Sequence, residues 1–337
     1  MTQPTAVLTG LGTFVPPRIV TNEELSLTMD TSDEWIRTRT GITRRHWADP
    51  GTATGDLAVA AGERALKSAA VTEVDLLIVA TTTPDHSCPA TAPDVAARLG
   101  LGNIAAYDVA AVCSGFVYAL AAASGALAAG IARQVLVIGA ETYSHILDPG
   151  DRTTSVIFGD GAGAVVLRAG DPAEPGALQG FDLGSDGTLK DLIVVPGGGS
   201  RQRAAAAADP AAPPADPYFR MRGREVFRHA VTRMADSSRA VLDRTGWEPE
   251  SVARFVGHQA NSRILHAVAD QLGMDRERVV VNLDRVGNTS AASIPLALAD
   301  AVEDGLLAPG DRVLMSAFGG GVTWGSTALV WPDVTPH

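Results

Sequence analysis

The chain has 337 residues, of which 46% are hydrophobic, 19% are charged and only two are cysteines. This length suits two domains or one large α/β unit, the apolar content excludes a mainly disordered chain, and two cysteines cannot build a disulfide framework. The net charge of −11 argues against general binding to nucleic acid or to anionic membranes, although a local basic patch can still hold a phosphorylated ligand.

The N-terminal residues lack the basic and apolar segments of a signal peptide, so the sequence predicts a soluble, cytoplasmic protein. After them, short β-branched runs alternate with alanine-rich stretches, which is the pattern of an α/β protein. The expected strands of the first half are Ala6–Gly10, Leu76–Thr81, Ala105–Val109, Val135–Gly139 and Ala162–Leu167. The expected helices of this half are Gly55–Ala69, Thr91–Leu99 and Gly115–Gly130.

The stretch from Val109 to Ala132 carries no charge and is long enough to span a bilayer. It is built mainly from small residues, which contribute little to transfer into lipid and suit close packing inside a protein. A helix without a polar face is either in a membrane or fully buried. We therefore expect Gly115–Gly130 to be a buried helix between two sheets.

The segment Arg201–Pro217 is rich in alanine and proline and predicts an exposed loop of variable order. The predicted halves are residues 1–175 and 176–337, and the loop belongs to the second. The expected strands after it are Arg254–Gly257, Val279–Leu283, Val313–Ala317 and Ser326–Val330, and the expected helices are Arg224–Thr245, Arg263–Leu272 and Ser290–Asp304. Because the order of these elements resembles that of the first half, the sequence predicts a duplicated α/β unit.

Cys113 follows an expected strand and precedes an expected helix, a position in which the positive end of the helix dipole favours a thiolate. The alternative is an inert buried cysteine. His258 and Asn288 also follow expected strands, although the first is equally suited to satisfy a loop carbonyl and the second to cap a helix. Pseudo-equivalent turns of two duplicated halves would bring the three side chains to one cavity.

Two glycine-rich segments are also candidates for a functional role. Phe318-Gly319-Gly320-Gly321 follows a strand and has no Cβ over three residues, so its peptide N–H groups and that of Cys113 suit an oxyanion hole. Asp160-Gly161-Ala162-Gly163 lies between two expected strands and is interpreted as a hairpin turn.

Several motifs in one order resemble those of the β-ketoacyl-acyl carrier protein synthase III family, and the resemblance covers nearly the whole chain outside Arg201–Pro217. They are Asp30-Thr31-Ser32-Asp33-Glu34-Trp35-Ile36, Arg37-Thr38-Arg39-Thr40-Gly41-Ile42, Val109-Ala110-Ala111-Val112-Cys113-Ser114-Gly115-Phe116, Gly257-His258-Gln259-Ala260-Asn261, Gly287-Asn288-Thr289-Ser290-Ala291-Ala292-Ser293 and Phe318-Gly319-Gly320-Gly321-Val322-Thr323-Trp324-Gly325. The resemblance implies the thiolase-like fold, with duplicated α/β halves in a five-layer α/β/α/β/α arrangement, and a homodimer.

The same resemblance implies an acyltransferase that performs a decarboxylative Claisen condensation. Cys113 would take the acyl group from an acyl-CoA, which is a substrate and not a cofactor. His258 and Asn288 would assist decarboxylation of malonyl-acyl carrier protein and stabilise the enolate. The chemistry needs no metal, and no histidine or cysteine spacing suggests one.

Matching positions imply further contacts. The residues implied to bind CoA are Thr31, Trp35, Arg39, Arg152, Gly223, Phe227, Ala260 and Asn261. Arg224 and Arg228, which share a helix face, and Arg263 are implied to dock the acidic carrier protein, although solvated helix charges explain the first two equally well. Cys88 occupies a position that is a bulky Phe in the acetyl-specific form and that lines the partner's acyl pocket.

The smaller Cys88 predicts a starter that is longer than acetyl or branched. The alternatives to fatty acid synthesis are a priming ketosynthase of an aromatic polyketide pathway and a thiolase-fold acyltransferase that forms no C–C bond. A non-catalytic partner resembling a chain-length factor is disfavoured by the intact set of Cys113, His258 and Asn288.

Overall fold

The computed structural model describes residues 4–209, 211 and 213–337 of the chain. Residues 1–3, part of the N-terminal sequence used to exclude a signal peptide, lie outside the described residues, as do residues 210 and 212 of the 201–217 segment. Among the described helices, none is long and apolar enough to cross a membrane.

The first sheet has five strands in the order β1-β7-β6-β4-β5. Strand β4 is parallel to β5 and β6, whereas β7 is antiparallel to β6 and β1. The strands are β1 (Thr5–Phe14), β4 (Leu76–Ala80), β5 (Ala105–Val109), β6 (Gln134–Glu141) and β7 (Gly161–Gly170). All five were expected, and for the inner strands the reason is that short apolar runs suit strands covered on both faces.

The second sheet has four strands in the order β11-β12-β13-β8. Strand β11 is parallel to β12, and β13 is antiparallel to both β12 and β8. The strands are β8 (Leu178–Ser185), β11 (Arg254–Gly257), β12 (Arg312–Gly319) and β13 (Thr323–Val330). The sequence did not predict β8, whose residues are mostly half-buried and lack a continuous apolar run.

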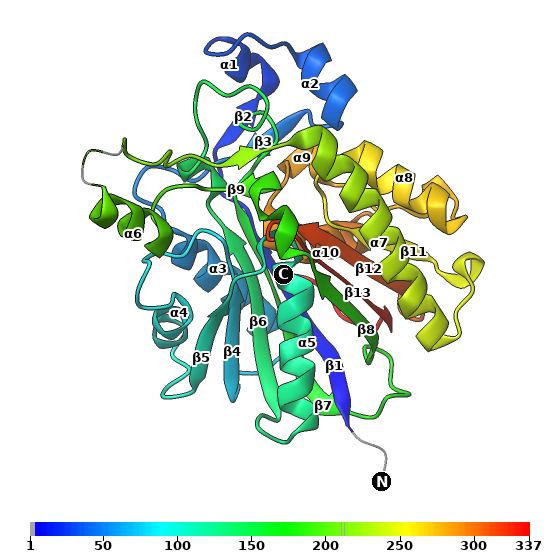
Figure 1. Cartoon of the computed structure of the whole chain (residues 1–337). Coiled ribbons are helices and arrows are strands. Elements are labelled where there is room, and N and C mark those ends of the chain that lie inside the picture. The colour runs from blue at the N-terminus through cyan, green and yellow to red at the C-terminus, as the bar shows by residue number, and fades with distance from the viewer. Residues whose placement is uncertain (1–3, 210, 212) are drawn as a thin grey trace.

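Two helices lie between the sheets and two pairs lie outside them, which gives the five layers of the thiolase-like fold (Figure 1). Helices α5 (Gly115–Ala128) and α10 (Ser293–Glu303) contact both sheets, while α3 (Thr54–Ser68) and α4 (Ala92–Arg98) cover the first sheet. Helices α7 (Gly223–Thr245) and α8 (Ser262–Leu272) cover the second. Helix α5 and both sheets contribute to one apolar core, as expected, although the helix ends at Ala128 and its Gly125 is exposed.

The remaining elements are short. Strands β2 and β3 pair with each other, as do β9 and β10, and α1 and α2 lie beside the first of these ribbons (Figure 1). The bounds are α1 (Asn22–Ser26), α2 (Asp33–Thr40), α6 (Ser200–Ala208), α9 (Leu283–Val286), β2 (Ile19–Thr21), β3 (Arg44–His46), β9 (Ile193–Val194), β10 (Arg220–Met221), η1 (Val112–Ser114), η2 (Tyr143–His145), η3 (Gly187–Leu192), η4 (Pro249–Ser251), η5 (Arg276–Arg278) and η6 (Ser290–Ala292).

The expected strand Val279–Leu283 is wrong. Only Val279 makes a bridge, to Phe255, and a helix already begins at Leu283. The buried Gln259 side chain replaces the missing ladder: it donates to Val280 O at 3.0 Å and accepts from Asn282 N at 3.0 Å. A β-like sequence therefore lies at a sheet edge without forming a strand.

Two further expectations need correction. The 201–217 segment is not a loop throughout, because Ser200–Ala208 forms α6, an exposed helix in which alanine has high helix propensity. Asp160 does not lie in a hairpin turn. It is buried, and its carboxylate accepts hydrogen bonds from Ala48 N and from Ser144 N, so it anchors two loops where β7 begins.

Candidate active site

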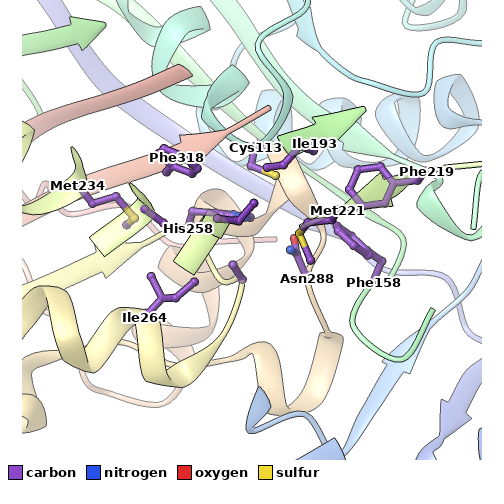
Figure 2. Close-up of a pocket in the computed structure, with 13 residues that line it drawn as sticks. Cys113, Phe158, Ile193, Phe219, Met221, Met234, His258, Ile264, Asn288 and Phe318 are labelled. Atoms are coloured by element: carbon purple, nitrogen blue, oxygen red, sulfur yellow. The ribbon is translucent and has the colours of Figure 1, made fainter. Parts of the chain in front are cut away.

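One cavity lies between the ends of the two sheets, and the three predicted side chains line it together (Figure 2). Cys113 reaches it from the turn after β5, His258 from the end of β11, and Asn288 from the loop after α9. The rest of the lining is largely apolar and comprises Phe158, Ile193, Phe219, Met221, Val226, Ala230, Met234, Ala260, Ile264 and Phe318. An acyl chain and a pantetheine arm suit such a surface better than a charged ligand does.

Cys113 lies in η1, immediately before α5, and is buried. Val112 holds a left-handed φ of 48°, which turns the chain so that the cysteine side chain enters the cavity. Burial raises the pKa of the thiol to about 12. Burial thus favours the neutral thiol and opposes the helix end, which the sequence suggested would favour a thiolate.

His258 is buried and carries no charge at neutral pH, because burial lowers its pKa to about 3. Its Nδ1 atom lies 2.7 Å from Ser293 Oγ, at the start of α10. When the serine hydroxyl donates to Nδ1, the neutral ring carries its proton on Nε2. The imidazole then presents a hydrogen-bond donor without a positive charge.

The amide of Asn288 is oriented by its neighbours. Its Oδ1 atom accepts a hydrogen bond from Ser290 N at 2.9 Å, and its backbone N–H donates to Ile157 O. The helix cap that the sequence offered as an alternative is not formed, because Thr289 is the N-cap residue of η6. Asn288 instead closes a local turn that uses only the oxygen end of its amide. Nδ2 remains as a donor beside the cavity.

The glycine-rich turn after β12 lies against the nucleophile turn. A Cβ atom on Gly319 would lie 2.7 Å from Cys113 N, and one on Gly320 would lie 3.2 Å from Val112 Cγ2. Only residues without a side chain allow this approach. The turn therefore places its backbone in direct contact with the turn that carries Cys113.

The residues implied to hold the CoA nucleotide form one cluster. The guanidinium carbon of Arg39 lies 4.4 Å from the centre of the Trp35 ring, and that of Arg152 lies 5.5 Å from it. Arg152 also pairs with Asp30 at 2.8 Å. Thr31, next to Asp30, has a buried hydroxyl that meets no hydrogen-bond partner in the described structure. An aromatic ring flanked by two cations suits a phosphorylated nucleotide.

Of the residues implied to contact pantetheine, some lie at the cavity and others do not. Ala260 lines the cavity, and Phe227, on α7, packs beside Arg263. Gly223 is the exposed first residue of α7. The Asn261 amide is already engaged, since it donates to Arg39 O at 2.8 Å and caps α8 by accepting from Arg263 N.

Arg224, Arg228 and Arg263 are exposed, and none of them forms a salt bridge within the described ranges. The α7 and α8 helices that carry them pack against each other. Cys88 is exposed in the loop after β4 and does not line the cavity of this single chain.

Sequence reasoning did not select Glu141, Ser290 and Ser293. Ser293 fixes His258, and Ser290 hydrogen-bonds Asn288 through its backbone and Glu141 through its hydroxyl at 3.0 Å. The sequence did contain one signal for Glu141, which is an acidic residue directly after the apolar run of residues 135–140 in β6.

Two family models match the chain. The model described as 3-oxoacyl-[acyl-carrier-protein (ACP)] synthase III matches residues 107–187, and its C-terminal counterpart matches residues 242–331. Together they contain Cys113, His258 and Asn288.

Curated relatives and solved structures match over almost the full length. The chain is 70% identical to β-ketoacyl-[acyl-carrier-protein] synthase III 5 of Streptomyces coelicolor, over 98% of both proteins. The crystal structure of 3-oxoacyl-(acyl carrier protein) synthase III from Pseudomonas aeruginosa superposes with a TM-score of 0.92 at 50% identity, covering 98% of this chain and all of that one. The priming β-ketosynthase from the R1128 polyketide biosynthetic pathway superposes with a TM-score of 0.90 at 35% identity, covering 98% and 97%.

Proposed function

This chain belongs to the 3-oxoacyl-[acyl-carrier-protein] synthase III family of condensing enzymes, and from that premise we propose that Cys113 carries the starter acyl group while His258 and Asn288 stabilise the enolate of a malonyl extender. The substrates would be an acyl-CoA and malonyl-acyl carrier protein, and the product a β-ketoacyl-acyl carrier protein. The acyl-CoA is consumed, and the proposed chemistry needs no cofactor.

The first half-reaction is transfer of the acyl group to sulfur. Because burial raises the pKa of Cys113 to about 12, the thiol must lose its proton as the thioester approaches. The thiolate then attacks the acyl carbon and CoA leaves. Backbone N–H groups of the Cys113 turn and of the Gly320 turn would stabilise the oxyanion, a role that their close approach supports.

The second half-reaction is decarboxylative condensation. Loss of CO₂ from the malonyl group leaves negative charge on the thioester oxygen, and two neutral donors beside the sulfur would stabilise it. These are His258 Nε2–H and Asn288 Nδ2, since Ser293 occupies the other ring nitrogen and Ser290 the amide oxygen. A carboxylate at position 288 would repel that charge, so an amide there favours decarboxylation over proton abstraction.

The single observation that carries this proposal is that Cys113, His258 and Asn288 line one apolar cavity. An acyltransferase that forms no C–C bond needs the thiol but has no use for two donors aimed at an enolate oxygen. The test is release of ¹⁴CO₂ from [3-¹⁴C]malonyl-acyl carrier protein when the acyl-CoA is added. Release matched by β-ketoacyl product supports condensation, whereas acyl transfer to an alcohol without ¹⁴CO₂ contradicts it.

Surface residues suggest where CoA and the carrier protein would each bind. The CoA nucleotide would stack on Trp35 between Arg39 and Arg152, with Thr31 beside it. Arg224, Arg228 and Arg263 carry exposed positive charge on a chain of net charge −11, and would receive an acidic carrier protein. Reversing the charge of Arg228 should raise KM for the carrier protein and leave KM for acyl-CoA unchanged.

We also propose that the starter is longer than acetyl or branched. The support is Cys88, a small residue that is exposed on the single chain and so free to meet a partner copy. In a homodimer it would line the partner's acyl pocket. Comparing kcat/KM for acetyl-, butyryl- and isobutyryl-CoA tests this, and a preference for acetyl over both others would refute it.

Polyketide priming is the second candidate, with the same chemistry and a different pathway. The observation that favours it is the 35% identity to the R1128 priming β-ketosynthase over nearly the whole chain. Assays with carrier proteins from fatty acid and polyketide systems separate the two, because the cognate carrier should give the higher kcat/KM.

A further inference from the structure

A buried polar network lies behind Cys113, and the steps above do not use it. At its centre is Glu141, the last residue of β6, which is fully buried. Its carboxylate accepts hydrogen bonds from Thr82 N at 3.0 Å, from the Thr83 hydroxyl at 2.9 Å and from the Ser290 hydroxyl at 3.0 Å. An ionised carboxylate without water is costly, and these donors are what make it possible here.

Ser290 connects this carboxylate to the nucleophile. Its hydroxyl donates to Glu141 at 3.0 Å, and η6, which begins at Ser290, packs against η1, which carries Cys113. Its backbone N–H is held by Asn288 Oδ1, and its φ of 48° is left-handed, which is unfavourable for a serine. Contacts on several sides thus fix the direction of this hydroxyl.

Two groups near Cys113 are able to accept its proton, and they differ in basicity. Burial lowers the pKa of His258 to about 3, so its neutral ring is a weak base. Burial raises the pKa of Glu141 to about 7, so its carboxylate is the stronger base. The titratable groups that face Glu141 are Cys113 from η1 and Tyr143 from η2, and in the described part of the chain no cationic side chain contributes to the Glu141 pKa.

We propose that Glu141 takes the Cys113 proton through the Ser290 hydroxyl during acylation and returns it when the condensation ends. This inference rests on the proposed function and adds to it a proton acceptor that leaves His258 Nε2–H intact as a donor. The division of labour follows from the contacts, because His258 is held by Ser293 whereas Glu141 is held by Ser290.

The proton balance closes over one cycle. In acylation the S–H proton moves to Ser290 Oγ while the Ser290 O–H proton moves to Glu141. The sulfur then bonds to the acyl carbon, and CoA leaves as a thiolate that takes a proton from water. In condensation the enolate carbon bonds to the acyl carbon, the C–S bond to Cys113 breaks, and the sulfur regains its proton from Glu141 through Ser290.

The test is the pH dependence of Cys113 acylation in a single turnover, followed by intact-protein mass spectrometry without malonyl-acyl carrier protein. For the unaltered enzyme the rate should rise as Glu141 ionises near pH 7 and level off above it. Glu141→Gln keeps the side-chain volume, and Ser290→Ala keeps the N–H that holds Asn288. Both variants should acylate Cys113 at least ~10-fold more slowly at pH 8, and their rates should no longer level off above pH 7. The acylation rate of the His258→Ala variant should still rise near pH 7.

If Glu141 acted only through its charge, the Glu141→Gln variant would change the acylation rate in the opposite direction. The negative charge of Glu141 raises the pKa of Cys113, so its removal without a relay would speed acylation. Glu141→Gln acylating as fast as the unaltered enzyme, or faster, would therefore overturn the proposal. A rate in the unaltered enzyme that keeps rising to pH 10 would overturn it without any variant. If the unaltered enzyme never gains an acyl group on Cys113, the proposed function itself fails.

Discussion

At the scale of single residues, the site depends on which polar atoms already have a hydrogen-bond partner within the protein. Asn288 accepts from Ser290 N through Oδ1, which leaves Nδ2 for the substrate, and His258 is held at Nδ1 in the same way. Both side chains are thus neutral donors whose direction is fixed before a substrate arrives. This preorganisation is what makes hydrogen-bond donors effective toward charge that develops only during the reaction.

Asn288→Asp tests the donor role directly. One carboxylate oxygen can still accept from Ser290 N, while the other presents negative charge where Nδ2 was. We expect malonyl decarboxylation to fall by at least ~100-fold, because a donor is lost and a repulsive charge is added. Acylation of Cys113 should persist, so ¹⁴CO₂ release and acyl adduct formation are measured on the same sample. Equal loss of both would contradict the assignment.

Glu141 also predicts a pH dependence of stability. Its pKa is raised from 4.5 to about 7 in the folded protein, so the folded state binds the proton more tightly than the unfolded chain does. Its contribution to the free energy of unfolding is therefore present below pH 4.5 and lost as the pH rises toward 7. With about 1.4 kcal/mol per pKa unit, the loss is of the order of a few kcal/mol. Denaturant unfolding of Glu141→Gln should lack this slope, and parallel curves would contradict the shift.

At the scale of elements, two glycines let each half approach the functional turn of the other. A Cβ on Gly139 in β6 would lie 2.3 Å from Ala291 O in η6, and one on Gly319 in β12 would lie 2.7 Å from Cys113 N in η1. The first residues of these turns, Val112 and Ser290, share a φ of 48°. The duplication expected from the order of elements is thus visible in matching backbone details.

Gly319→Ala should displace the Cys113 turn. We expect a loss of about 1–3 kcal/mol of stability from overpacking and a slower acylation of Cys113, measured by thermal unfolding and by single-turnover mass spectrometry. Gly125→Ala, in an open position on α5 where a Cβ meets nothing within 4 Å, is the matched control. It should stabilise the protein by about 0.5–1 kcal/mol, since alanine favours the helix. Equal behaviour of the two variants would be inconsistent with the packing described.

The elements also show which parts of the fold the sequence could predict and which it could not. Apolar runs predicted the central strands and α5 because burial on both faces leaves a continuous pattern. They failed at Val279–Leu283, where one side chain, Gln259, takes the hydrogen bonds of a neighbouring strand. Family motifs placed Cys113, His258 and Asn288 in one site. Ser290 and Glu141 were missed as a pair because their hydrogen bond joins residues 149 positions apart.

At the scale of the whole molecule, the homodimer that the family resemblance implies remains a prediction, and the exposed Cys88 is the residue that tests it. If Cys88 lines the partner's acyl pocket, Cys88→Phe should shift kcat/KM toward acetyl-CoA while acylation still occurs on Cys113. Light scattering gives the assembly state, and acyl-CoA competition gives the preference. A monomer in solution, or a Cys88→Phe variant with unchanged acyl preference, would refute this part of the account.

The chain contains two cysteines, so the central claim has a direct test. The protein is incubated with an acyl-CoA, digested and mapped by mass spectrometry before and after addition of malonyl-acyl carrier protein. The account predicts one acyl group on the peptide that contains Cys113, its disappearance with β-ketoacyl product on adding the malonyl substrate, and no adduct with Cys113→Ala. An adduct on Cys88, or one that persists on the Cys113→Ala protein, would contradict it.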